Sequence, residues 1–269
     1  MTQAWMEEKH AKAFETWTSL NCSDLKRLFE GFNETQLFLK HKENVSGKSF
    51  VEIACATGEL YRYLSNFHPG IRYQGFDVSD SAIRRAKKKY GDSNFSVCEE
   101  DLSDLEISGR PSFVWARDVV HHQRHPFDFM KKLLSLGGEL TVLRIRTRDQ
   151  GESVVDSETS YQQIYNQRVP YIVLNTDEVL TFICDTVPVR TIELVKNYQP
   201  LAGKNGRVLP KECYDPATGT AETAVCITRF KEGMRASRKP EIVQVQRKDL
   251  VRFKSSIFSR AKAFIRSAP

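Results

Sequence analysis

Apolar runs alternate with amphipathic stretches from residue 49 to residue 147. The apolar runs predict strands over 49–55, 71–78, 94–101, 112–120 and 139–147. The stretches between them place apolar residues at helical spacing and predict helices over 58–67, 80–91 and 126–138. Strands that alternate with helices at this rhythm form parallel βαβ units. The pattern therefore predicts an α/β fold built on a doubly wound, mostly parallel sheet.

The flanks of this region follow other patterns. Residues 3–42 have helical periodicity, and 176–186 predicts one more helix. Two strand-like runs, 189–199 and 222–230, are joined by a loop rich in Gly and Pro and predict an antiparallel pair at one edge. The whole sheet is then seven-stranded, mostly parallel, with an antiparallel last strand. We predict a helical cap over 1–44 and a main domain over 45–230, with substrate loops at 148–175 and 200–221.

The charge of the chain is concentrated in its tail. The formal net charge is +6, but from Arg229 onward twelve Lys and Arg face three Asp and Glu, so the preceding 228 residues carry −3. Residues 231–269 predict a basic linker and an amphipathic C-terminal helix. Such a helix packs on the body or a partner protein, or lies on an anionic membrane surface. A nucleic-acid-binding role ranks last, because the phenylalanines of this helix suit packing or lipid better than base stacking.

Composition indicates a cytoplasmic protein, with the inner membrane surface as a peripheral alternative through the tail. The 269 residues hold no apolar run long enough to span a bilayer, and the N-terminus lacks the apolar segment of a secretory signal. The six cysteines are scattered without a CxxC pair, which favours free thiols and no metal site.

Candidate chemistry follows the carboxyl ends of the predicted strands, where open α/β sheets bind ligands. The first strand runs into a turn, ACATG (54–58), that opens a helix. Asp77 ends the second strand, at the spacing where a carboxylate accepts the hydroxyls of a ribose. Asp101, beside Leu102, follows the third strand and suits an adenine amine, although Glu99 and Glu100 compete for that role. A dinucleotide cofactor is disfavoured, because the glycine needed for close pyrophosphate approach is alanine here.

These features in this order resemble class I S-adenosylmethionine-dependent methyltransferases over residues 45–230. The resemblance is carried by EIACATG, GFDVSDSAIRRAKKKYG, CEEDLSDL and FVWARDVVHHQRHPFDFMKKLLSLGGELTV. It implies S-adenosylmethionine as cofactor, held by the strand ends. The implied cofactor-binding residues are Glu52, Ala54, Ala56 and Gly58 around the methionine part, Asp77 and Val78 at the ribose, Asp101 and Leu102 at the adenine, and Arg117 at the far end.

The sequence departs from the family pattern in its first turn. Ala54 and Ala56 replace two of the usual glycines, whereas Gly58 is kept. Glycine in such turns permits a positive φ and close approach of the backbone to a ligand. Alanine adds only a methyl group and is tolerated where φ is negative. We therefore expect a slightly reshaped turn that still holds a cofactor.

Candidate catalytic and substrate residues follow the fourth and fifth strands. His121 and His122 are candidate general bases, since histidine titrates near neutrality, with substrate contact or an ordinary helix start as alternatives. The polar, tyrosine-rich segment 148–175 suits a pocket, and 200–221, with Lys204 and Arg207, could close it. The predicted substrate-binding residues are Arg146, Arg148, Tyr161, Tyr165 and Tyr214. Their cationic side chains favour an anionic or sugar-like substrate.

The sequence thus predicts a transferase that moves a methyl group from S-adenosylmethionine to an oxygen or nitrogen of a small polar metabolite, such as a sugar. The alternative is a catalytically inactive protein of the same fold that binds a partner through its basic tail. A nucleic-acid methyltransferase is disfavoured, because a body of charge −3 grips a phosphate backbone poorly.

Overall fold

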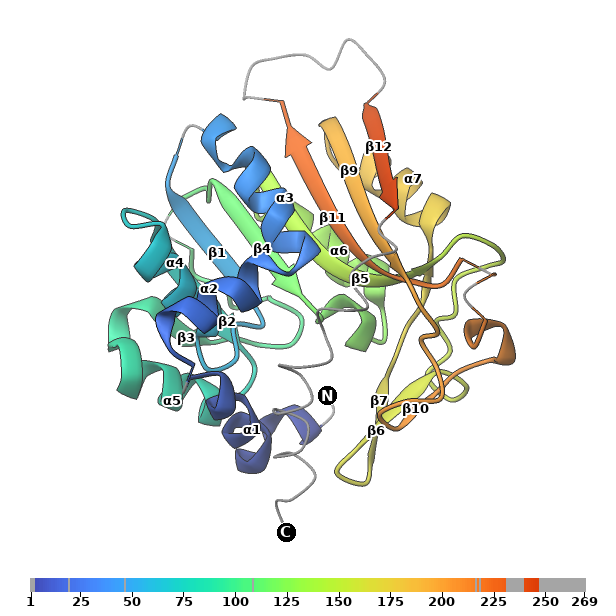
Figure 1. Ribbon diagram of the computed structural model, residues 1–269, viewed down its shortest axis with the longest axis horizontal. Coiled ribbons are helices and arrows are strands. Elements are labelled where there is room, and N and C mark those ends of the chain that lie inside the picture. Colours follow the sequence, from blue (N-terminus) through green and yellow to red (C-terminus); the bar gives the residue numbers. More distant parts are fainter. Residues whose placement is uncertain are drawn as a thin grey trace.

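The computed structural model describes most of the chain in one three-layer α/β arrangement (Figure 1). The described residues are 3–18, 20–45, 47–107, 109–215, 217, 219–230 and 240–246. The helices are α1 (Glu8–Thr18), α2 (Cys22–Glu30), α3 (Asn33–His41), α4 (Glu59–Phe67), α5 (Asp80–Tyr90), α6 (Pro126–Ser135) and α7 (Thr176–Thr186). Short 3-10 turns include η1 (Gln3–Met6), η4 (Val120–His122) and η5 (Lys211–Cys213). The predicted C-terminal helix lies outside the described residues.

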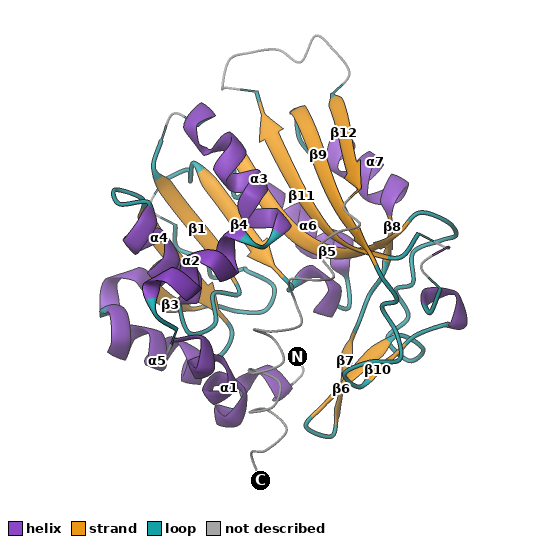
Figure 2. Cartoon of the chain, in the orientation of Figure 1, coloured by secondary structure: helices purple, strands orange, loops and turns teal. Residues whose placement is uncertain are grey.

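One large sheet forms the centre of the molecule (Figure 2). Its strands are β1 (Ser49–Ile53), β2 (Arg72–Asp77), β3 (Phe95–Val97), β4 (Phe113–Arg117), β5 (Leu140–Arg148), β8 (Leu174–Asn175), β9 (Val189–Tyr198), β11 (Ala221–Arg229) and β12 (Glu241–Gln246). The order is β12-β9-β11-β5-β4-β1-β2-β3, with β8 paired to β5. Strands β1 to β5 pair in parallel, and β11 runs antiparallel to both of its neighbours. The predicted mostly parallel sheet with an antiparallel strand at 222–230 is confirmed. The predicted count of seven is wrong, because the described residues form nine strands in this sheet and β12 follows β11.

The prediction of a linker beyond residue 231 is wrong for its last part. Residues Glu241–Gln246 form β12, which pairs in parallel with β9 from Glu241↔Thr191 to Gln246↔Lys196. The strand covers the edge that the sequence assigned to the antiparallel pair. The β9 edge would otherwise present unpaired backbone groups, which sheets commonly cover.

Apolar side chains bury both faces of the sheet. One core cluster packs α6 and α7 against β1, β4, β5, β9 and β11, and it includes the fully buried Met130 and Leu133. The other packs α2 to α5 against the opposite face, around Phe38, Phe50 and Trp115. Asn21, Ser79 and Asn175 cap α2, α5 and α7 by accepting backbone N–H groups of the first turn.

The segment 148–175, predicted as a loop, contains a hairpin. Strands β6 (Tyr161–Ile164) and β7 (Gln167–Pro170) pair antiparallel, and β10 (Arg207–Val208) adds to β6 as a third strand. The two connecting residues, Tyr165 and Asn166, have φ of 47° and 64°. Positive φ at both positions is typical of the tight turn that suits strand twist. This small sheet lies below the carboxyl ends of the parallel strands (Figure 1).

Candidate functional site

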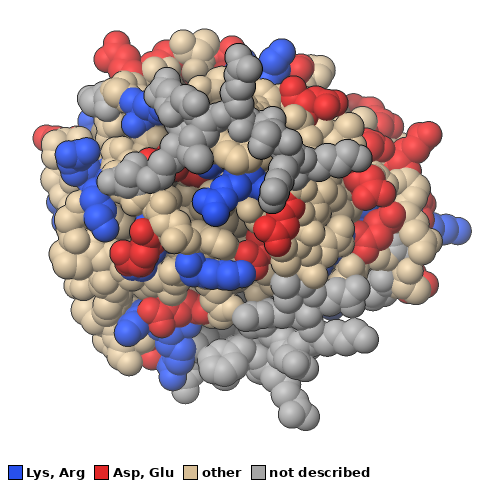
Figure 3. Space-filling model, turned by 90° about the horizontal axis from the view of Figure 1, so that it is seen from above, with Lys and Arg blue, Asp and Glu red and all other residues tan. Residues whose placement is uncertain are grey.

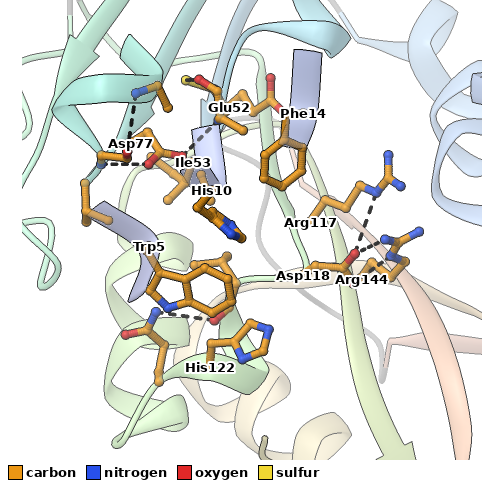
Figure 4. A pocket seen from close by; sticks show the side chains of 18 of the residues that line it. Trp5, His10, Phe14, Glu52, Ile53, Asp77, Arg117, Asp118, His122 and Arg144 are labelled. Carbon is orange, nitrogen blue, oxygen red and sulfur yellow. Dashed lines mark hydrogen bonds and ion pairs between the residues drawn. The ribbon is translucent and has the colours of Figure 1, made fainter. Parts of the chain in front are cut away.

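A cavity of about 850 Å³ lies at the carboxyl ends of β1, β2, β4 and β5. Its walls come mainly from the strand ends with the turns that follow them, η1 and α1, the β6 hairpin, and the segment 199–207. Phe29 of α2, Phe129 of α6 and Glu222 of β11 complete them. Figure 4 shows labelled side chains from the first two groups converging on the cavity. Its place is the one at which doubly wound sheets bind ligands.

The turn after β1 has the backbone shape of a glycine loop although it holds alanine. Ala54 has φ of 64° and Ala56 has φ of 48°, and both line the cavity. The condition under which alanine is tolerated in such a turn, a negative φ, is therefore not met. A left-handed conformation costs a non-glycine residue roughly 1–2 kcal/mol. The turn thus retains its backbone course and carries strain, and such strain is typical of ligand-binding sites.

Gly58, which ends this turn, does not line the cavity but shapes it. It caps α4 with φ of 84°, and a Cβ atom there would meet Phe95 ring atoms at 2.9 Å. Both the positive φ and the close approach of Phe95 require glycine. Gly58 is thus a backbone requirement for the start of α4.

Asp77 faces the cavity from the end of β2 and organises the turn beside it. Its Oδ2 accepts the backbone N–H of Ala56 at 2.9 Å, and its Oδ1 accepts that of Ser79 at 2.8 Å. Burial raises the pKa of this carboxyl, while the backbone N–H groups oppose that rise. Val78, its neighbour, also lines the cavity. Both residues of the predicted ribose-binding pair therefore line the cavity, and their role in binding a ribose stays a prediction.

Two buried carboxyls give this half of the cavity an acidic wall. Glu52 accepts the hydroxyl hydrogen of Tyr73, and burial raises the pKa of Glu52 to about 8. Glu59 accepts the hydroxyl hydrogen of Thr57, and burial raises its pKa to about 7. Glu59 escaped the sequence analysis. The one sequence feature that could have indicated Glu59 as a cavity residue is its position directly after the 54–58 turn.

The third strand places a different acid at the cavity from the one predicted. Asp101 does not line it; its carboxylate accepts Lys132 Nζ at 2.9 Å and the backbone N–H of Ser103 at 3.0 Å. These bonds lower the pKa of the exposed Asp101 to about 2. Glu100 and Leu102 line the cavity instead, and Leu102 has φ of 59°. The carboxylate of Asp101 is thus engaged by Lys132 and Ser103 outside the cavity lining.

The two histidines occupy different positions. His121 is 2% exposed and does not line the cavity, whereas His122 does. Burial lowers the pKa of His122 to about 3 and that of His121 well below its usual value, so neither titrates near neutrality as predicted. His122 Nδ1 lies 2.8 Å from the carbonyl oxygen of Pro170. A carbonyl only accepts, so Nδ1 holds the proton and Nε2 keeps a lone pair.

A buried ion-pair network forms the far wall. Asp118, which follows β4, accepts Arg144 Nε at 2.8 Å and Arg146 at 3.0 Å. Glu34 of α3 lies 3.0 Å from Arg144 and 3.3 Å from Arg117. Figure 4 shows Arg117 and Arg144 converging on Asp118. The sequence analysis found Arg117 and Arg146 but not Arg144; the alternation Arg144, Arg146, Arg148 along one face of β5 was the available signal.

The N-terminal segment supplies an aromatic wall that the sequence analysis placed only as a helical cap. Trp5, His10 and Phe14 line the cavity. The Trp5 ring lies 4.7 Å from the His122 ring and 4.9 Å from the His10 ring, centroid to centroid. In Figure 4 Trp5 and His10 stand between Asp77 and His122. These contacts join residues far apart in sequence.

Most predicted substrate residues lie outside the cavity lining, and only Arg146 belongs to it. Arg148 is buried toward Glu212 at 3.6 Å. Tyr161 packs under Arg168, and the ring centroid of Tyr165 lies 4.1 Å from Lys9 Nζ. Tyr214 is exposed. The segment 199–207 brings Lys204 and Arg207 to the cavity, as the sequence analysis suggested for that loop.

No helix among the described residues has the length and apolar character that a membrane span requires. Within the same residues, His, Cys, Asp and Glu side chains form no group of three or more suited to a metal ion.

Comparison with known proteins agrees with the geometry. Residues 51–138 match the sequence model of a family described as "Methyltransferase domain". The fold resembles phosphoethanolamine N-methyltransferase 2 of Haemonchus contortus, solved with S-adenosyl-L-methionine (TM-score 0.54, 12% identity, 84% of this chain). This chain spans 58% of the length of that protein.

Two smaller proteins align over nearly their whole length. Magnesium protoporphyrin IX methyltransferase of Synechocystis PCC 6803 gives a TM-score of 0.50 at 12% identity, covering 85% of this chain and 95% of that one. An S-adenosylmethionine-dependent methyltransferase of Clostridium acetobutylicum gives 0.52 at 12% identity, covering 83% and 98%. The chain therefore has the fold of class I S-adenosylmethionine-dependent methyltransferases, and residues 51–138 match a methyltransferase-domain model.

Proposed function

We propose that this protein binds S-adenosylmethionine and transfers its methyl group to an oxygen or nitrogen of a small polar metabolite. The observation that carries this proposal is the single cavity that joins the Asp77 side to the His122 side. Its volume of about 850 Å³ lies high in the range of roughly 300–1,000 Å³ that is typical of small-molecule sites. The cavity thus offers room for a cofactor and a small acceptor together.

The acidic half of the cavity fits this cofactor. Glu52, Glu59, Asp77 and Glu100 line it together. Burial raises the pKa of Glu52 to about 8 and that of Glu59 to about 7, so a bound cation would favour their ionised forms, whereas a pyrophosphate would oppose ionisation. Asp77 would hold the ribose hydroxyls, Glu52 would lie near the methionine part, and Leu102 would cover the adenine. The bound cofactor supplies an electrophilic methyl group on a positively charged sulfur.

The other half positions the acceptor. His122 keeps a fixed tautomer through Pro170 and presents Nε2 as a hydrogen-bond acceptor. With a pKa of about 3, it is a weak base, so its contribution is to aim an O–H or N–H group rather than to remove its proton beforehand. Trp5 packs against the same ring. Positioning of this kind supplies much of the acceleration in a direct displacement.

A small acceptor suits the surface as well as the cavity. On the face shown in Figure 3, Lys and Arg side chains are interspersed with Asp and Glu. A broad basic surface is the usual mark of a protein that grips a phosphate backbone. The mixed charges of this face support a small-molecule acceptor.

Calorimetric titration with S-adenosylmethionine and with S-adenosylhomocysteine tests the proposal. We expect micromolar binding of both by the wild-type chain and strongly weakened binding by Asp77→Ala with an unchanged circular dichroism spectrum. Absence of binding up to millimolar ligand by a folded wild-type chain would reject the enzyme and favour a non-catalytic binding protein. Unchanged affinity in Asp77→Ala would reject the ribose assignment.

A further inference from the structure

The far wall of the cavity holds a set of charges that balance one another. Three arginines, from β4 and β5, meet three carboxylates, from α3, the end of β4 and β11. The arginines are Arg117, Arg144 and Arg146, and the carboxylates are Glu34, Asp118 and Glu222. Buried ions require such partners, because desolvation costs several kcal/mol per charge. The three positive charges of this network are therefore balanced by its three negative charges.

Two further cations line the cavity outside this network. Arg207 and Lys204 come from the segment 199–207, and neither forms an ion pair within the described residues. The Nε of Arg207 is buried and has no hydrogen-bond partner there. Buried polar groups are almost always satisfied, so an orphaned guanidinium nitrogen at a cavity wall points to a ligand.

The structure holds Arg207 in a defined place. Its guanidinium carbon lies 4.6 Å from the ring centroid of Tyr171, which is fully buried and whose hydroxyl accepts Arg146 Nε at 2.9 Å. A single tyrosine thus positions one arginine of the network and the one outside it. Stacking on an aromatic ring restricts a guanidinium and leaves its N–H groups available.

The backbone before Arg207 is equally constrained. The N–H of Arg207 bonds to the carbonyl of Lys204 at 3.1 Å, and Arg207 pairs with Gln162 across the small sheet. Gly206, between them, has φ of 71°, and a Cβ there would lie 2.8 Å from the carbonyl oxygen of Gln163. Only glycine fits, so the turn that presents both cations has one shape.

We propose that Arg207, assisted by Lys204, binds an oxyanion, a phosphate or carboxylate, carried by the methyl acceptor. The planar guanidinium matches either group through paired N–H donors. The inference rests on the proposed function, since it concerns the acceptor half of the same cavity. It narrows the acceptor from a polar metabolite to an acidic one and disfavours a neutral sugar.

The test titrates the full chain with inorganic phosphate and, separately, with acetate, both in the presence of saturating S-adenosylhomocysteine and in its absence. We expect saturable binding in the millimolar range or tighter, and at least a tenfold loss in Arg207→Gln. Arg168→Gln is the matched control: it removes the same charge from an exposed arginine of the same small sheet and should leave the affinity unchanged. Tighter binding of phosphate than of acetate would identify the acidic group of the acceptor as a phosphate, and the reverse preference would identify it as a carboxylate.

The outcomes separate the two proposals. Normal binding of S-adenosylhomocysteine without anion binding, or with an equal loss in both variants, overturns the oxyanion site and leaves the methyltransferase standing. Anion binding that depends on Arg207 without S-adenosylhomocysteine binding rejects the proposed function alone. Lys204→Gln serves if Arg207→Gln does not fold, and it should weaken anion binding severalfold, less than Arg207→Gln would, because Lys204 is exposed. An unchanged affinity there overturns the assignment.

Discussion

The backbone N–H of Ala56 lies 2.9 Å from Oδ2 of Asp77, so the carboxylate at the end of β2 holds the turn that follows β1. The other oxygen of the same carboxylate is 2.8 Å from the N–H of Ser79. One side chain therefore fixes both turns that border the proposed ribose position. Ligand affinity and turn geometry are expected to change together when this residue is altered.

Asp77→Asn tests this double role. The asparagine amide group would face a backbone N–H with another donor, leaving a buried donor unsatisfied at a cost of roughly 1–3 kcal/mol. We expect the affinity for S-adenosylmethionine to fall at least tenfold by calorimetry. Asp80→Asn, at an exposed carboxylate paired with Arg84, should bind as wild type. Equal losses in both variants would show a general charge effect instead.

The two alanines of the turn give a stability prediction. Ala54 and Ala56 have positive φ, and glycine adopts that region without strain. Relief of about 1 kcal/mol in Ala54→Gly or Ala56→Gly should raise the unfolding midpoint by about 2–4 °C. Ala86→Gly, in the middle of α5, should lower the midpoint because glycine is a poor helix former. A lower thermal unfolding midpoint in Ala54→Gly and Ala56→Gly than in the wild type would show that the alanines do not strain the turn.

Local sequence was sufficient for the parts of the fold and site that depend on short segments. The alternation of strands and helices predicted the sheet, and the spacing of Asp77 from the turn placed it in the cavity. Strand β12 could not be predicted, because a short apolar run after a charged segment does not reveal which edge it will join. Nothing local predicted that Trp5 would meet His122, because that contact depends on how η1 packs.

Two predictions about the site were wrong for structural reasons that the sequence does not show. Leu102 takes a left-handed conformation, and beside it Glu100 lines the cavity whereas Asp101 bonds to Lys132. The pKa of His122 depends on burial among residues distant in sequence, such as Trp5 and Tyr171, so its usual value was a poor guide. Positive φ in bulky residues and burial by distant elements are tertiary properties.

The raised pKa of Glu52 predicts how stability depends on pH. The folded-state pKa of about 8 exceeds the ordinary value of 4.5, so folded protein retains a proton that the unfolded chain has released between these limits. The free energy of unfolding should therefore fall as pH rises from about 5 to 8, by an amount on the order of a few kcal/mol. Glu59, with a pKa raised to about 7, adds in the same direction.

Urea unfolding at several pH values measures this dependence. Glu52→Gln still accepts the Tyr73 hydroxyl hydrogen but cannot ionise, so its stability should decline much less between pH 5 and 8. The exposed Glu43→Gln should keep the wild-type slope. If Glu52→Gln declined as steeply as wild type, the buried carboxyl would not be the source of the dependence.

Trp5 lies at the junction of the two halves of the cavity, so its truncation should affect ligand affinity more than folding. The segment before α2 is tied to the body at other points, by Glu7 to Gln167 at 3.1 Å and by Glu8 to Arg85. Trp5→Ala should therefore leave the thermal midpoint nearly unchanged while the affinity for S-adenosylmethionine falls about tenfold, through loss of apolar contact and entry of water. Trp5→Phe should retain most of the affinity, because an aromatic ring still packs on His122.

The control for Trp5→Ala is Met6→Ala in the same 3-10 turn, whose exposed side chain does not line the cavity. If Met6→Ala weakened binding as much as Trp5→Ala, the effect would come from fraying of the segment, and the indole would have no specific role as a wall.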